Sequence, residues 1–158
     1  MNKYQIFGEK AEQIVSELLK NKKTKGKIEK KRGRGIHGDF HIGKKTIEVK
    51  GWWTDEDTKS EKDYPCRTVK ISGAEYEQLQ NDPKNFELQA VYRLDREHKT
   101  NKGHPVRYTV MPGEVLKECK AQSVTLRVPE KVWQDPRVTQ KDLPTNLKKK
   151  FGLNKNEK

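Results

Sequence analysis

The chain has 158 residues, of which 30% are hydrophobic and 37% are charged, and its formal net charge is +12. We expect one domain with a small core, and the lack of any apolar run near the ~20 residues of a membrane span argues against a transmembrane protein. The positive charge favours a polyanionic partner, and we expect nucleic acid rather than an anionic membrane surface. Cys66 and Cys119 lack the C-x-x-C spacing of zinc sites, so we expect free buried thiols and a cytoplasmic protein.

The first predicted element is an amphipathic helix over residues 4–20. Its apolar residues recur at helical spacing and form one stripe: Phe7, Ala11, Ile14, Val15, Leu18 and Leu19. Glu12 lies at the edge of this stripe, where its carboxylate can reach the interior at the helix margin. An ordinary boundary glutamate is the alternative interpretation.

A strongly basic connection, KNKKTKGKIEKKRGRG, follows at residues 20–35. It is either a solvated loop around a short first strand near residues 27–31 or an arm that binds phosphates. We favour the arm, because it lies close in sequence to Asp39. The basic residues assigned to nucleic-acid binding here are Lys30, Lys31, Arg32 and Arg34.

Residues 38–51, GDFHIGKKTIEVKG, alternate polar and apolar side chains on both sides of a glycine, which predicts a β-hairpin. A two-residue loop at Gly43 and Lys44 places Phe40 opposite Ile47. A four-residue loop also keeps the two apolar sets on one face, whereas a three-residue loop without a bulge separates them. Burial therefore favours the matched registers.

In the two-residue register, Asp39 lies opposite Glu48, and Lys50 shares the face of Glu48. Two carboxylates and a lysine that converge in this way suggest a site for a hard cation such as Mg²⁺ or Mn²⁺, with a lysine that can orient or deprotonate water. A hairpin that simply exposes its charged face to solvent is the alternative.

The rest of the chain alternates strands and short helices. Four further strands are predicted, at residues 66–71, 86–95, 105–111 and 123–128. Ser72 and Glu75 form a capping box that starts a helix ending near Gln80, and a second short helix is predicted at residues 114–120. Lys70 and Trp52 are candidates for nucleic-acid contact, Trp52 by stacking on a base, although packing on the sheet edge explains Trp52 equally well.

Residues 136–158 are polar and basic and end in KKKFGLNKNEK, which predicts a flexible C-terminal tail. Its last part, residues 145–158, is expected to be mobile or to become helical only on a partner. The folded domain is therefore predicted to span residues 1–135.

The order of these elements resembles the PD-(D/E)xK nuclease superfamily, and in particular its Holliday-junction-resolvase-like and Mrr-like members. The resemblance covers residues 4–95. The matching stretches are the GDF of residues 38–40, the IEVKG of residues 47–51 and the GEKAE helix start of residues 8–12. Gly38 stands where the nominal motif has a proline. The resemblance implies an α/β fold with a restriction-endonuclease-like core, in which a central mixed β-sheet is flanked by helices.

The resemblance also implies a metal-dependent DNA endonuclease. Asp39 and Glu48 would ligate Mg²⁺, for which Mn²⁺ can substitute, together with the backbone carbonyl of Val49. Glu12 would complete the site directly or through water, and Lys50 would position the attacking water. DNA is the expected substrate, with RNA not excluded, and a homodimer would supply two sites. The alternatives are a structure-selective nuclease, such as a junction resolvase, and a non-catalytic nucleic-acid-binding protein of the same fold.

Overall fold

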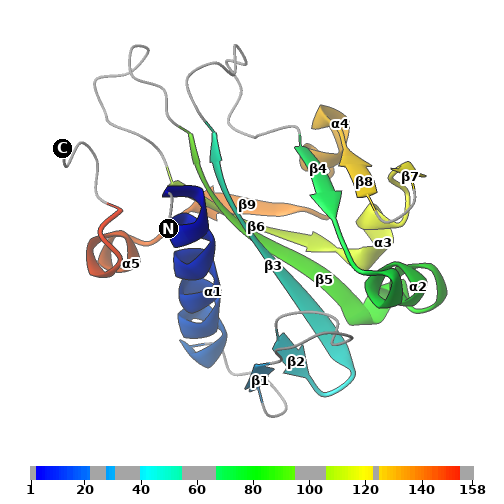
Figure 1. Ribbon diagram of the computed structural model, residues 1–158, viewed down its shortest axis with the longest axis horizontal. Helices are drawn as coiled ribbons and strands as arrows, with labels where there is room; N and C mark the ends of the chain where they lie inside the picture. The colour runs from blue at the N-terminus through cyan, green and yellow to red at the C-terminus, as the bar shows by residue number, and fades with distance from the viewer. Residues whose placement is uncertain are drawn as a thin grey trace.

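The computed structural model describes residues 3–21, 28–30, 40–54, 67–94, 106–122 and 125–153. Within these ranges the chain is an α/β protein built on a six-stranded sheet, with a second, three-stranded sheet beside it (Figure 1). The predicted α/β class with a central mixed sheet flanked by helices is confirmed. No helix in the described ranges has the length and apolar content needed to cross a membrane.

The large sheet has the strand order β1-β2-β3-β5-β6-β9. Its strands are β1 (Ile28–Lys30), β2 (Phe40–Ile42), β3 (Lys45–Thr54), β5 (Phe86–Leu94), β6 (Val106–Pro112) and β9 (Thr139–Asp142). The ladder between β3 and β5 is parallel, and the other ladders of this sheet are antiparallel. A parallel pair needs a long crossover between its strands. Here the crossover contains β4 (Arg67–Lys70), α2 (Gly73–Asn81) and the 3₁₀ turn η1 (Pro83–Asn85).

Helix α1 (Lys3–Asn21) covers one face of the large sheet (Figure 1). The predicted apolar stripe is buried at every position and packs with Ile47 and Val49 of β3. The helix lies close to β3 at Gly51, where an added Cβ would lie 2.8 Å from Cβ of Ala11. Glycine at this position of the strand therefore lets α1 lie close against β3.

The opposite face of the large sheet carries a second core. The small sheet, of order β4-β8-β7, lies over it with β8 (Thr125–Val128) and β7 (Ala121–Gln122). Helices α2, α3 (Gly113–Leu116) and α4 (Glu130–Trp133) complete this layer (Figure 1). Its buried apolar residues are Val69, Ile71, Leu79, Phe86, Leu88, Tyr92, Met111, Val115, Leu116, Leu126, Val128, Val132 and Trp133.

The C-terminal segment differs from the predicted flexible tail over residues 139–153. Strand β9 pairs with β6 at the edge of the large sheet, and α5 (Thr145–Lys150) follows it. Three leucines bury themselves in the α1 core: Leu143, Leu147 and Leu153. Lys150 Nζ also lies 2.5 Å from Oε1 of Glu17 on α1. Only Leu147 lies within α5, and the three leucines are scattered in a lysine-rich stretch, so composition alone did not predict their burial.

Candidate functional site

The β2–β3 hairpin has the predicted two-residue loop. Phe40 pairs with Ile47, and Ile42 pairs with Lys45, which leaves Gly43 and Lys44 as the turn. Gly43 has a φ of 59°, the left-handed conformation that the first position of the favoured hairpin turns requires. The expected pairing of Phe40 with Ile47 is thus confirmed, and of the two loop lengths that allow matched faces the shorter one is present. Asp39, which precedes β2, lies outside the described residues.

Glu48 and Lys50 share one face of β3, as the alternation predicted. Glu48 Oε2 lies 3.0 Å from Lys50 Nζ, and their side chains are 11% and 27% exposed. Ile47 and Val49, between and beside them, point to the opposite face and pack under α1. The hairpin therefore presents a largely buried carboxylate with a cation in direct contact.

The neighbours of this ion pair on β5 are apolar. The parallel ladder sets Glu48 beside Leu88 and Lys50 beside Ala90, both about 1% exposed. Apolar surroundings lower the local dielectric and strengthen charge interactions, so any cation near Glu48 is held more strongly than at an open surface. The charges of Glu48 and Lys50 thus lie against the buried apolar side chains of Leu88 and Ala90.

Glu12 is half-buried on α1, next to the residue that contacts Gly51. Helix α1 covers the Val49 face of β3, whereas Glu48 points to the other face. Among the described residues β2 pairs with β3 only as far as Ile47. Glu12 and Glu48 therefore approach from opposite faces of β3. A ligand bound by both would have to lie at the edge of β3, past the last residue that pairs with β2.

A complete metal-ligand set is not seen in the described residues. Within them, no group of three or more His, Cys, Asp or Glu side chains is arranged to hold an ion. Glu48 supplies one hard oxygen donor, which is of the type that Mg²⁺ accepts. Because Asp39 lies outside the described residues, joint ligation of Mg²⁺ by Asp39 and Glu48 stays a prediction.

The residues predicted to bind nucleic acid fall into two groups. Lys31, Arg32 and Arg34 lie outside the described residues, and Lys30 is the last residue of β1. The other two can be placed. Lys70 is exposed at the end of β4, and Trp52 is half-buried, with its ring 5.9 Å from that of Trp133 in an edge-on arrangement. Packing on the second core thus accounts for Trp52 without a stacked base.

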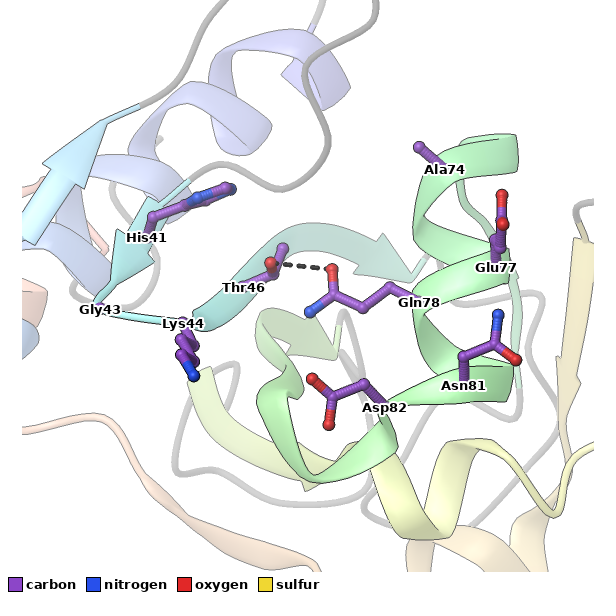
Figure 2. Close-up of a pocket in the computed structure, with 9 residues that line it drawn as sticks. All are labelled: His41, Gly43, Lys44, Thr46, Ala74, Glu77, Gln78, Asn81 and Asp82. Atoms are coloured by element: carbon purple, nitrogen blue, oxygen red, sulfur yellow. Dashed lines mark hydrogen bonds between the residues drawn. The ribbon is translucent and has the colours of Figure 1, made fainter.

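A groove of about 610 Å³ opens between the tip of the β2–β3 hairpin and α2 (Figure 2). At its base Thr46 Oγ1 donates a 2.9 Å hydrogen bond to Oε1 of Gln78, whose Nε2 donates to the carbonyl oxygen of Asn85. Thr46 lies on the same face of β3 as Glu48, two residues before it, but Glu48 and Lys50 are not among the residues that line the groove. Its other lining side chains are mixed in charge: His41, Lys44, Glu77, Asn81 and Asp82.

Sequence reasoning missed this groove, because it depends on a contact between residues 32 positions apart. It also missed the environment of Glu75. The predicted capping box is confirmed: Glu75 N–H donates to Ser72 Oγ, and Ser72 N–H donates to Glu75 Oε1. Glu75 is only 4% exposed, and its Oε2 has no hydrogen-bond partner among the described residues. A buried carboxylate thus lies on the core-facing side of α2, one turn before Gln78.

Cys119 does not form a reactive centre. Its thiol is half-buried and lies 3.8 Å from the carbonyl oxygen of Val115. Burial raises the pKa of the Cys119 thiol to about 11, and the nearby Glu118 carboxylate acts in the same direction. The thiol is therefore neutral near pH 7, as expected for a structural cysteine. Cys66 lies outside the described residues.

Comparison of the chain with protein-family models, with curated proteins and with solved structures finds no match. The candidate site therefore depends on its own geometry and on the order of its elements.

Proposed function

We propose that this protein is a metal-dependent DNA endonuclease with a restriction-endonuclease-like core. The observation that carries the proposal is the contact of Glu48 with Lys50 on one face of β3, 3.0 Å apart and beside an apolar wall. A surface-only role for the hairpin would leave both side chains in solvent. Here Glu48 is only 9% exposed, whereas glutamate is seldom so deeply buried.

The proposed site uses Glu48 and Asp39 to hold Mg²⁺ or Mn²⁺, with the carbonyl oxygen of Val49 as a further ligand and Glu12 placed directly or through water. The bound ion would offset the charge that develops on the phosphate oxygens. Lys50 would then turn from Glu48 toward the attacking water, which its ammonium group can orient. The contact seen here fits a resting arrangement in which Lys50 neutralises the carboxylate.

Two further features support a nucleic-acid substrate. The net charge of +12 attracts polyanions, and the groove is lined by Thr46, which shares a face of β3 with Glu48. The order α1, hairpin, β4, α2, β5 also follows the order of the superfamily that the sequence resembles. A symmetric dimer would bring two such sites to the two strands of a duplex.

A cleavage panel with Mg²⁺ tests this proposal and its nearest alternatives. The substrates are plain duplex DNA, a four-way junction, a flap, single-stranded DNA and duplex RNA, each with parent protein and with Asp39→Ala. We expect cleavage of DNA that Asp39→Ala abolishes while binding persists. Preference for the junction would make the enzyme structure-selective. Tight binding without cleavage in either Mg²⁺ or Mn²⁺ would show a non-catalytic binding protein.

A further inference from the structure

The small sheet turns one face away from the core. Val69, Leu126 and Val128 point inward and are buried, so the alternate residues point outward. We call these outward residues the basic sheet face: Thr68, Lys70, Lys120, Gln122, Thr125 and Arg127. All are exposed except Thr125, which is half-buried. Figure 1 shows this small sheet beside the large sheet, at the upper right of the view.

Backbone pairing fixes the arrangement of the basic sheet face. Thr68 pairs with Arg127, and Lys70 pairs with Thr125. On the other side of β8, Gln122 pairs with Thr125, and Arg127 N–H donates a 2.9 Å hydrogen bond to the carbonyl oxygen of Lys120. The three cations therefore lie on β4, on β8 and directly before β7, across roughly 10 Å of sheet at the usual strand spacing.

Among the residues that the structure describes, no acidic side chain balances the charge on this face. Lys120 stands directly opposite Arg127, an arrangement of like charges that destabilises a strand pair. Within the described part of the chain no carboxylate forms an ion pair with Lys70, Lys120 or Arg127. The acidic residue nearest in sequence, Glu118, is held instead by Arg137 at 2.7 Å. The three cations therefore repel one another, and an anionic partner bound to this face would reduce that repulsion.

We propose that the basic sheet face binds the phosphate backbone of duplex DNA; this rests on the proposed nuclease function. Duplex DNA carries one negative charge per ~1.7 Å of its axis, so a 10 Å face meets several phosphates. The threonine and glutamine side chains between the cations can donate hydrogen bonds to phosphate oxygens. Lys70 is three residues before the start of α2, which lines the groove beside β3. DNA held here lies alongside that helix.

A duplex fits this face better than an anionic membrane does. Interfacial membrane proteins combine cations with apolar side chains that enter the lipid. The basic sheet face has no large apolar residue, and the large hydrophobic side chain that is exposed among the described residues, Ile6, lies on α1. The face is therefore suited to contact a polar, charged backbone.

The test is the salt dependence of duplex binding, measured by fluorescence anisotropy in EDTA so that cleavage plays no part. The variant Lys70→Gln/Lys120→Gln/Arg127→Gln is compared with the parent. Each lost phosphate contact reduces the slope of log K against log salt by about 0.9, so we expect a slope shallower by about 2 to 3. Affinity at ~50 mM salt should fall at least tenfold.

The matched control, Lys20→Gln/Lys141→Gln/Lys149→Gln, removes the same charge from exposed positions on α1, β9 and α5. Equal slopes and affinities for the two triple variants would overturn the inference, as would a parent that does not bind duplex DNA. Loss of binding to phosphatidylserine vesicles, with DNA binding unchanged, would assign the face to membranes instead. If the triple variant does not fold, the single variant Lys70→Gln takes its place. Its slope of log K against log salt should be shallower than that of the parent by about 1. The two failures are distinguishable, because a parent that binds duplex DNA through this face but does not cut it in the Mg²⁺ panel refutes the nuclease proposal alone.

Discussion

Substitution of Gly51 by alanine tests the packing that places α1, and with it Glu12, against β3. The added Cβ would lie 2.8 Å from Cβ of Ala11, 3.1 Å from Cα of Gly8 and 3.2 Å from the carbonyl oxygen of Phe7. Two of these atoms belong to the helix backbone and cannot move without the helix. We therefore expect the cost of overpacking, about 1–3 kcal/mol, which lowers Tm by roughly 2–9 °C for a chain of this length.

Urea denaturation gives the free energy of unfolding for Gly51→Ala, Ala11→Gly and the double variant. Ala11→Gly alone should cost about 1 kcal/mol through helix propensity. Because it removes the nearest clashing atom, the double variant should be more stable than additivity predicts, by at least ~0.5 kcal/mol. Gly8→Ala is the control: a Cβ there meets nothing within 4 Å, and we expect stabilisation of about 0.5–1 kcal/mol. A neutral Gly51→Ala, or strict additivity, would refute this packing of α1.

Three further predictions concern the C-terminal segment, α2 and the free thiol. Leu147→Ala should lower the free energy of unfolding by about 2–5 kcal/mol in urea denaturation, because Leu147 is only 3% exposed. The control, Lys149→Ala, should change it by no more than ~0.5 kcal/mol. Equal small effects of the two substitutions would instead support a flexible C-terminal tail. Glu75→Ala should cost about 1 kcal/mol through loss of the capping box, and exposed Glu77→Ala much less, so equal thermal shifts would contradict this role. With the other cysteine replaced by serine, alkylation of Cys119 by iodoacetamide should be slow at pH 8 and accelerate toward pH 11, since its pKa is raised to about 11; fast labelling at pH 7 would disprove this.

Local patterns predicted much of the hairpin and its flanking helix. Glu48 and Lys50 are two residues apart on one strand, so alternation alone puts them on the same face. Burial of Phe40 and Ile47 on one side then favoured the matched hairpin registers, of which the structure has the one with a two-residue loop. The capping box at Ser72 likewise needs only a four-residue signal. Each of these features is settled by contacts within a short stretch of chain.

Features that depend on distant contacts were not predictable in this way. The pairing of β4 with β8 joins residues almost sixty positions apart. The alternation of side chains in a strand does not indicate which other strand it pairs with. The groove behind Thr46 depends on Gln78 in the same manner. In the C-terminal segment the lysines dominated the composition, and the buried leucines became visible only once α1 offered a surface for them.

The cleavage rate of Lys50→Ala relative to Lys45→Ala tests the central claim most directly. Both lysines lie on β3, but Lys45 is two residues before Ile47, on the α1 side, and pairs with Glu87 at 3.7 Å. Single-turnover cleavage of duplex DNA in Mg²⁺ should fall by about 100-fold or more for Lys50→Ala, with DNA binding retained, and should change little for Lys45→Ala. Equal rates for the two variants, or cleavage by Lys50→Ala at the parent rate, would contradict a nuclease site at Glu48 and Lys50.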